Sequence, residues 1–409
     1  MKIMFSHNNF PGQYRRIMTH IEDMKDVHAS TVTLASNKNK YALPRVNFTP
    51  HREARKEIHP AIRSVESNVI VGQAAYKSLM AYKKKMGSPD IILAHSGWGA
   101  SLFFKDIFPD AKFLSYYEWY YHCHGGDGEF IERTRYDANA EMRIRMKNTP
   151  ILHDLAAQDW GQSPTMFQKS RFPEIFRDRI SVLHDGVDTD YFCPEAGSKV
   201  TVNGKTLTQN DEVITYIARG MEAYRGFPQF MEAISKLQKT RPNLQVVILG
   251  NDRIAYGNRQ ADGKGLKEPM LEKFDFDMDR IHFMGIQPLA VMRALLRISS
   301  AHIYLTAPFV LSWSMLEAMS TGALVIGSDT EPVRELIKDG ENGVLVDFWN
   351  VDALVDTTNK VLDNQKDFEH LRAQARNHIV NHYATRDLLP KYWQLINDVA
   401  EGRTPKLAP

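Results

Sequence analysis

Residues 304–329 read YLTAPFVLSWSMLEAMSTGALVIGSD, and this stretch decides the fold. It begins with a short apolar run that ends at Pro308, and it passes through a loop into helical spacing over residues 314–320. Thr321-Gly322 then interrupts the helix, and residues 324–326 form a second apolar run. A strand, a loop, a short helix and a strand in this order are the βαβ unit of a parallel sheet.

The loop of this unit predicts a ligand site. Ser312 and Ser314 stand directly before the expected helix, and parallel sheets bind ligands beyond the carboxyl ends of their strands. Free N–H groups and the positive end of the helix dipole favour phosphate at such a position. Glu317, one turn into the helix, is placed to accept hydrogen bonds from ribose hydroxyls. The stretch alone fits equally well an ordinary βα turn with a solvated glutamate.

Strands alternate with helices along the rest of the chain, which predicts a parallel, doubly wound architecture. Apolar runs predict strands at residues 2–5, 30–35, 90–95, 111–116 and 180–184, then at 212–217, 243–249, 280–283, 301–305 and 344–346. Helical spacing predicts helices at residues 14–24, 58–85, 137–147, 228–240, 289–299, 351–363, 368–382 and 386–400. Residues 41–51 are expected to be irregular. Residues 194–211, with a hairpin at Asn203-Gly204, mark the expected domain boundary.

The composition is that of an ordinary globular protein. A chain of 409 residues with 43% hydrophobic residues is long enough for two domains, each with its own core. The net charge of +2 argues against the strongly basic surface of a protein that binds nucleic acid. Two cysteines, Cys123 and Cys193, form neither a disulfide framework nor a metal-binding pattern, and they fit a reducing compartment. We therefore expect a cytoplasmic protein.

We expect no signal peptide and no membrane-spanning segment. The sequence opens on a predicted strand, and no run of about 18 apolar residues occurs. Two local basic clusters, residues 52–56 and 83–85, are explained most simply as solvated helix faces. Peripheral contact with anionic lipid at the inner face of a membrane stays open.

Three predicted strand ends in the first half carry polar groups, at residues 7–13, 95–98 and 117–122. In an open parallel sheet these ends share the edge where ligands bind. Glu118 or His122 there can accept a proton from an acceptor hydroxyl, and the neighbouring aromatic rings can stack on a sugar. Any one of the histidines, taken singly, fits a structural role better.

Gly12 lies in the first of these loops and marks it as a ligand edge, although a Pro-Gly pair also marks any tight turn. The run His122-Cys123-His124 suggests a metal, but adjacent residues cannot all point at one ion and no matching pair occurs elsewhere. We therefore expect no metal site.

In the second half, Arg219 and Arg225 follow the strand predicted at residues 212–217. Two arginines before a glycine and a helix can grip a pyrophosphate in a fork geometry that lysine does not supply. The pair by itself is a weak signal, because arginines are common in loops.

Together these features resemble the retaining glycosyltransferases of the GT-B fold, family 4, over nearly the whole chain. The marks of the resemblance occur in the family's order and spacing: His184-Asp-Gly-Val-Asp188 with Phe192, Arg219 with Arg225-Gly226, Phe283-Met-Gly285, Leu316-Glu317-Ala-Met319, and Glu335 followed by Asp339-Gly-Glu-Asn342-Gly343. The sequences of residues 8–13 and 308–314 resemble those of a bacterial subgroup of the family, which suggests a role in polysaccharide biosynthesis.

The resemblance implies an α/β fold with two Rossmann-like doubly wound domains that face each other across a cleft. Residues 1–192 would form the acceptor-side domain, residues 193–383 the donor-binding domain, and residues 384–409 a helix that crosses back to the first domain. The implied catalytic residues are Arg219, Arg225, Glu118 and His122. The implied donor site contains Gly12, Arg219, Arg225, Gly285, Ile286, Ser312, Ser314, Met315, Leu316 and Glu317.

In this scheme the arginines and the N–H groups of residues 314–316 bind the diphosphate, Glu317 binds the ribose, and the backbone at Gly285-Ile286 binds the base. The donor is a UDP- or GDP-linked sugar, and neither a metal nor another cofactor is needed, because arginines and a helix dipole stabilise the leaving group. The family usually has two glutamates eight positions apart, and Phe309 stands where the first one is expected.

The resemblance thus predicts retaining transfer of a hexose from a nucleotide diphosphate sugar to a hydroxyl of a glycan, lipid-linked or protein acceptor. Two alternatives stay open. A nucleotide-sugar 2-epimerase shares the architecture, and Phe309 raises the hypothesis of a catalytically inactive partner subunit that binds nucleotide or glycan.

Overall fold

The computed structural model describes residues 1–257 and 262–406. The chain divides into two compact units: the first comprises residues 1–129, 134–186 and 385–409, and the second comprises residues 130–133 and 187–384. The sequence placed the change after residue 192, and it placed residues 384–409 with the first domain. The last three of those residues lie outside the described part of the chain.

The change from the first unit to the second falls at Gly186, because the chain is already tied to the second unit from Val187 on. The Val187 N–H donates to the Tyr383 carbonyl at 2.7 Å, and Phe192 is buried in the core of the second unit. The turn itself is closed by His184, whose Nδ1 accepts the Gly186 N–H at 3.0 Å. An imidazole nitrogen thus caps the turn as an asparagine oxygen can.

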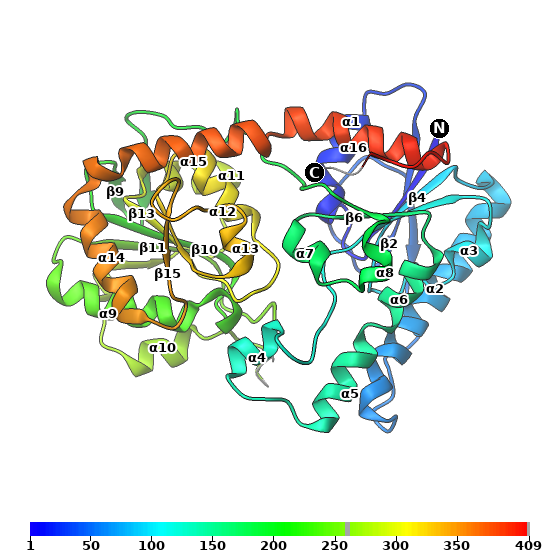
Figure 1. Cartoon of the computed structure of the whole chain (residues 1–409), viewed down its shortest axis with the longest axis horizontal. Helices are drawn as coiled ribbons and strands as arrows, with labels where there is room; N and C mark the ends of the chain where they lie inside the picture. Colours follow the sequence, from blue (N-terminus) through cyan, green and yellow to red (C-terminus); the bar gives the residue numbers. More distant parts are fainter. Residues whose placement is uncertain (258–261, 407–409) are drawn as a thin grey trace. The chain divides into compact units, whose positions relative to one another are not determined.

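The first unit is built on a seven-stranded parallel sheet with the order β3-β2-β1-β4-β5-β6-β7. Figure 1 labels β2, β4 and β6 of this sheet. Its strands are β1 (Lys2–Ser6), β2 (His28–Leu34), β3 (Arg45–Phe48), β4 (Ile91–His95), β5 (Lys112–Tyr116), β6 (Trp160–Ser163) and β7 (Ile180–Val182). Its helices are η1 (Gly12–Tyr14), α1 (Arg15–Ile21), η2 (Pro60–Ile62), α2 (Arg63–Met86), α3 (Phe104–Ile107), α4 (Asp127–Glu132, shared with the second unit), α5 (Ala138–Lys147), α6 (Thr149–Ala157), α7 (Met166–Ser170), α8 (Glu174–Arg177) and α16 (Thr385–Ala400).

The second unit is built on a six-stranded parallel sheet with the order β12-β11-β10-β13-β14-β15. The strands are β10 (Val213–Gly220), β11 (Gln245–Asn251), β12 (Ile281–Phe283), β13 (Ala301–Tyr304), β14 (Val325–Ser328) and β15 (Val344–Val346), and a hairpin of β8 (Lys199–Val202) and β9 (Lys205–Thr208) precedes them. The helices are η3 (Ala223–Arg225), α9 (Phe227–Thr240), α10 (Lys267–Lys273), η4 (Met278–Arg280), α11 (Leu289–Ile298), α12 (Trp313–Ser320), α13 (Glu331–Arg334), α14 (Val351–Asp363), η5 (Gln365–Phe368) and α15 (Glu369–His382). This strand order is that of the dinucleotide-binding doubly wound fold.

The predicted fold class, two Rossmann-like parallel-sheet domains, is confirmed. The predicted hairpin is also present, with Asn203 and Gly204 both at positive φ. Two strands were not predicted. Residues 41–51 contain β3, an edge strand of four residues with one buried side chain, and β6 is the short run Trp-Gly-Gln-Ser, which lacks β-branched residues. Neither has the periodicity by which a strand is recognised.

Both faces of each sheet are buried. In β11, Val247 and Leu249 pack into one apolar cluster with α11, α12 and α15, whereas Val246 and Ile248 pack into a second cluster with α9 and α14. In the first unit the two clusters contain α1 with α16 on one face and α2 with α3 on the other. Alternate residues of a strand point to opposite faces, so strands covered on both sides read as continuous apolar runs.

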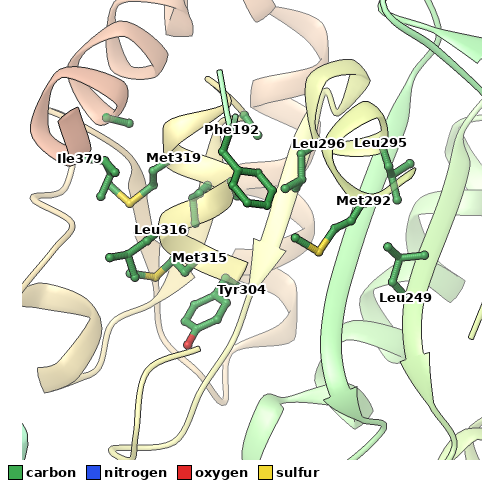
Figure 2. Packing of buried hydrophobic residues seen from close by; sticks show 14 of the residues in the cluster. Phe192, Leu249, Met292, Leu295, Leu296, Tyr304, Met315, Leu316, Met319 and Ile379 are labelled. Carbon is green, nitrogen blue, oxygen red and sulfur yellow. The ribbon is translucent and has the colours of Figure 1, made fainter. Parts of the chain in front are cut away.

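Helix α12 lies inside the second unit (Figure 2). Met315, Leu316 and Met319 are fully buried and pack with Phe192 and residues of α11 and α15. Because α12 is buried from Ser314 on, packing fixes the position of the helix, while Ser312 and Trp313 at its start are partly exposed. Within residues 1–257 and 262–406, no helix has the length and apolar character needed to cross a membrane.

His302 on β13 makes the second unit sensitive to acid. Its ring is fully buried, Nδ1 lies 2.9 Å from Thr215 Oγ1, and burial lowers its pKa from 6.5 to about 4. At pH 5 the unfolded chain therefore binds a proton that the folded chain does not. Stability from this histidine is present above pH 6.5 and is lost as the pH falls towards 4.

We expect this histidine to lower the free energy of unfolding by about 2 kcal/mol between pH 7 and pH 5. Urea unfolding at several pH values measures the loss, and His302→Leu should lose less stability over the same range. Equal pH dependence of the variant and the parent would contradict the assignment.

Candidate functional site

Arg225 lies at the carboxyl end of β10, where η3 turns the chain into α9. Gly226, at φ +61°, follows it, and an added Cβ there would lie 2.4 Å from Leu305 Cβ. The Arg225 carbonyl accepts a hydrogen bond from the Tyr216 hydroxyl at 2.9 Å, which ties the turn to strand β10. The corner thus needs a residue without a side chain beside the arginine.

The guanidinium of Arg225 is buried, with 6% of the residue exposed. Nη1 donates to Thr306 Oγ1 at 2.7 Å and to Tyr304 Oη at 3.4 Å, and the Tyr256 ring centroid lies 5.4 Å from Cζ. Burial lowers its pKa, but the neighbouring Tyr304, Tyr256 and Glu222 outweigh burial and raise the pKa above its usual value. In the part of the chain that the structure describes, no carboxylate forms an ion pair with it. Although the Glu222 charge acts on it, a buried guanidinium whose direct partners are hydroxyl groups and a ring can still pair with a bound anion.

Arg219, the other predicted arginine, is exposed near the end of β10. Between the two arginines in sequence lies Glu222, which is 1% exposed and was not predicted as a site residue. Its Oε2 accepts the N–H groups of Ala255 and Tyr256, the latter at 2.9 Å. Burial raises the pKa of Glu222, and the two N–H donors and the arginines oppose that rise. Glu222 thereby holds Tyr256 against Arg225.

The amino-terminal end of α12 lies beside Arg225 through Tyr304. The Tyr304 hydroxyl accepts from Arg225 Nη1 and also from the Ser312 N–H, at 2.8 Å. Ser312 is the N-cap of α12, and its Oγ lies 2.9 Å from Ser314 Oγ, which donates to the Ile217 carbonyl at 3.3 Å. The predicted hydroxyl cluster and the predicted arginine thus meet at one place, with the helix starting one residue earlier than expected.

The other predicted donor-site residues lie on α12 and after β12. The Met315 and Leu316 side chains are fully buried, so these residues can contact a ligand only through their backbone N–H groups. The Met315 N–H also donates to the Ser312 carbonyl at 3.3 Å. Glu317 is 7% exposed. Gly285, at φ +64°, accepts the Gly250 N–H at 2.9 Å, and an added Cβ would meet open space. Ile286 is 70% exposed and offers an apolar surface next to it.

Phe309 is 6% exposed and lies against two tyrosine rings. Its centroid is 5.4 Å from that of Tyr224 and 4.9 Å from that of Tyr256, both in edge geometry. Tyr256 is the ring that also contacts Arg225. Where the resemblance leads one to expect a glutamate, this chain therefore has an aromatic cluster.

We expect Phe309→Ala to lower the free energy of unfolding by about 3 kcal/mol, because it removes two ring contacts and leaves a cavity. The melting temperature of the second unit should fall by roughly 6–12 °C. Differential scanning calorimetry measures the shift, with Phe309→Leu, which fills most of the volume, as the control. A shift below about 2 °C for the alanine variant would show that the cluster contributes little to stability.

In the first unit, Glu118 lies at the carboxyl end of β5 within a network of side chains. Gln13 Nε2 donates to Glu118 Oε1 at 3.0 Å, and His95 Nε2 lies 3.5 Å from Glu118 Oε2. His7 Nε2 lies 3.0 Å from Gln13 Oε1, and the rings of His7 and His95 each have their centroid 4.9 Å from that of Trp98. The three predicted strand ends therefore meet, as the parallel topology requires.

His122 lies outside the network around Glu118, whereas Gly12 lies within it. His122 Nε2 donates to the Arg171 carbonyl at 2.7 Å, and burial lowers the pKa of the ring, which keeps it neutral near pH 7. The histidine that faces Glu118 is His95, which the sequence marked only as part of a polar strand end. Gly12 lies against the imidazole of His7. The catalytic role of His122 and the donor role of Gly12 remain predictions.

No group of three or more His, Cys, Asp or Glu suited to a metal ion occurs among residues 1–257 and 262–406. Cys123 Sγ donates to the Glu141 carbonyl, and His124 lies 3.0 Å from Glu129. The predicted independence of metal remains a prediction.

Comparison with protein families identifies the class. Residues 26–192 match the model described as glycosyl transferase family 4 group, and residues 201–378 match the model described as glycosyl transferases group 1. Together the two matches span most of the chain. The protein belongs to the GT-B glycosyltransferases of the family 4 type.

Two relatives are D-inositol 3-phosphate glycosyltransferases. The protein from Mycolicibacterium smegmatis is 25% identical over 195 residues, which are 46% of this chain and 41% of that protein. The protein from Corynebacterium glutamicum is 24% identical over 196 residues, 46% of this chain and 44% of that protein. The matched segment thus spans less than half the length of each relative.

Two solved structures share the fold over almost the whole chain. Sucrose-phosphate synthase from Thermosynechococcus elongatus has a TM-score of 0.73 at 14% identity, covering 98% of this chain and 99% of the other. HepE from Anabaena, solved in complex with UDP and glucose, has a TM-score of 0.69 at 13% identity, covering 97% of this chain and 100% of the other.

Proposed function

We propose that this protein transfers a hexose from a nucleotide diphosphate sugar to a hydroxyl group of a glycan, lipid-linked or protein acceptor, with retention of configuration. The observation that carries the proposal is Arg225, a buried guanidinium without a carboxylate partner in the described residues, beside the start of a buried helix. A diphosphate supplies oxygens that can pair directly with this guanidinium. The names of the relatives, and the UDP and UDP-glucose bound by HepE, agree with such a donor.

Each predicted donor contact has a physical role in this proposal. Arg225, with the more exposed Arg219, neutralises the charge that develops on the diphosphate as it leaves. The N–H groups at the start of α12 bind the same phosphates. Glu317 accepts hydrogen bonds from the ribose, and the Gly285 backbone and the exposed Ile286 side chain contact the base. These groups supply positive charge without a metal ion, which is why we propose a metal-independent enzyme.

The proposed step breaks the bond between the anomeric carbon and the phosphate oxygen and forms a bond from the acceptor oxygen on the same face of the sugar. The acceptor proton passes to the departing β-phosphate. The products are the glycosylated acceptor and a nucleoside diphosphate, so atoms and charges balance. The two free cysteines fit a cytoplasmic enzyme, and a lipid-linked acceptor would bring it to the inner face of the membrane.

Thermal shift with UDP, GDP and ADP tests donor binding, since a ligand that binds only the folded protein raises its melting temperature. We expect one nucleoside diphosphate to raise the melting temperature by several degrees at saturation, and the matching nucleotide sugar to be consumed. If no nucleoside diphosphate shifts the melting temperature, the proposal is wrong.

The aromatic packing of Phe309 favours a second candidate, a nucleotide-binding subunit without turnover. It shares donor binding with the first proposal and differs in the products. Release of nucleoside diphosphate from the donor would exclude it. Without an acceptor, conversion of the donor to the 2-epimeric sugar, either as the altered sugar nucleotide or as the free sugar together with nucleoside diphosphate, would indicate the epimerase.

A further inference from the structure

We infer that Gln13 and His7 are positioning residues that hold the Glu118 carboxylate, and that this carboxylate and Trp98, which both contact His95, bind an uncharged sugar ring of the acceptor. The inference rests on the proposed function and names the acceptor chemistry. All the residues concerned belong to the first unit.

The hydrogen bonds from the His7 loop to Glu118 have a fixed direction. The Asn9 N–H donates to His7 Nδ1 at 3.0 Å, so the proton of the neutral ring is on Nε2. His7 Nε2–H therefore donates to Gln13 Oε1, which leaves the Gln13 amide nitrogen to donate to Glu118 Oε1. Burial, and then the charge of His95, lower the pKa of His7 to about 3, so the ring stays neutral and the direction holds at ordinary pH.

The loop that carries Gln13 has no space for a side chain at the position before it. Gly12, directly before it, has φ +49°, and an added Cβ would lie 2.5 Å from His7 Nε2. The imidazole is thus packed flat against the backbone next to Gln13. The glycine that the sequence marked as a ligand edge serves to bring His7 and Gln13 together.

Trp98 provides an aromatic surface that packs on His95, the histidine that faces the Glu118 carboxylate. Its ring lies against His7 and His95 with interplanar angles of 50° and 52°, and the residue is half-buried. Its loop is anchored by Asp154, which accepts from Ser96 Oγ at 2.7 Å and from Ser101 Oγ at 3.0 Å. A rigid ring and a partly exposed carboxylate on either side of one histidine suit a sugar, whose C–H face packs on the ring while its hydroxyls donate to the oxygens.

The charge of this group favours an uncharged ligand. His7 and Gln13 are neutral, and Glu118, whose Oε2 lies 3.5 Å from His95 Nε2, is the acid of the group. A phosphorylated sugar placed on Trp98 would bring negative charge towards the carboxylate and be repelled. The acceptor sugar should therefore be neutral where it binds, whether it is free or part of a lipid-linked glycan.

The test is a titration of the ¹⁵N-labelled full chain, followed by the indole N–H signal that Trp98→Phe removes. Methyl glycosides of glucose, galactose, mannose and N-acetylglucosamine are added with and without UDP, and inositol 1-phosphate is the anionic probe. We expect at least one glycoside to shift the Trp98 signal saturably and inositol 1-phosphate to leave it in place. No shift with any glycoside, or an equal shift with inositol 1-phosphate, would overturn the inference.

Gln13→Leu tests the positioning role. Loss of the hydrogen bond to the carboxylate should weaken glycoside binding about ten-fold or more. The control is Asn39→Ala, which removes bonds to the Asn9 and Phe10 carbonyls of the same loop without touching Gln13. Unchanged glycoside binding in Gln13→Leu would overturn the positioning role.

In turnover assays Gln13→Leu should raise KM for the acceptor and leave KM for the donor unchanged. A smaller fraction of folded protein would instead lower the apparent kcat and change neither KM. The UDP thermal shift separates this inference from the proposed function. If UDP binds and no glycoside does, the inference alone fails. If glycosides bind and no nucleotide does, the proposed function fails.

Discussion

Replacing Arg225 by alanine is expected to lower kcat/KM for the donor by roughly 100- to 1,000-fold or more, because one preorganised charged donor to the leaving group is lost. The thermal shift with the nucleoside diphosphate should disappear in the same variant. The ligand-free variant should remain folded, since it loses a buried charge that has no ion pair among the described residues.

Arg225→Lys separates charge from geometry. A lysine keeps one positive charge but not the planar fork, so partial activity is expected. Lys236→Ala is the control: this lysine is on α9, after Arg225, and makes only exposed ion pairs with Glu232 and Asp352. Initial rates over a range of donor concentrations measure the effect. Turnover of Arg225→Ala at the parent rate would remove the donor-site assignment.

Replacing Gly226 by alanine is expected to lower the free energy of unfolding by about 2–4 kcal/mol. About 1 kcal/mol comes from placing a side chain at φ +61°, and the rest from overlap with Leu305, whose Cβ would lie 2.4 Å away and cannot move without its backbone. The shift in melting temperature should be roughly 4–16 °C. Because Arg225 is the neighbouring residue, donor affinity should fall as well.

Gly340→Ala is the matched control, since Gly340 has φ +71° but nothing within 4 Å of an added Cβ. It should show the backbone strain alone, about 1 kcal/mol by urea unfolding. If both variants lose the same stability, the contact with Leu305 is unimportant and the corner does not require a glycine for space.

Local patterns predicted most of the architecture. Apolar runs and helical spacing are properties of neighbouring residues, so the strands and helices around residues 304–329, and the alternation that makes both sheets parallel, could be predicted directly. The two missed strands, β3 and β6, are short and lack apolar alternation. They form because each pairs with a neighbouring strand through backbone hydrogen bonds, and local sequence patterns do not contain this pairing.

The candidate site was predicted in part. The sequence marked Arg225, Ser312 and Ser314 from loop and helix-start patterns, and the structure brings them together through Tyr304, which had no predicted role. Glu222 was missed because a glutamate in a loop looks solvated, and its burial depends on the backbone of Ala255 and Tyr256. The position of this glutamate between two arginines in the sequence was the signal that could have identified it as a site residue.

The sequence alone was enough for the alternation of most strands and helices and for which loops follow the strands, because both depend on local spacing and composition, and its motifs carry the family resemblance. Tertiary structure alone decided that Arg225 is buried while Arg219 is exposed, that His95 rather than His122 faces Glu118, and that Phe309 packs between two tyrosines. Burial and contact depend on segments far apart in the chain, and the free energy of a charge or a ring is set by those neighbours.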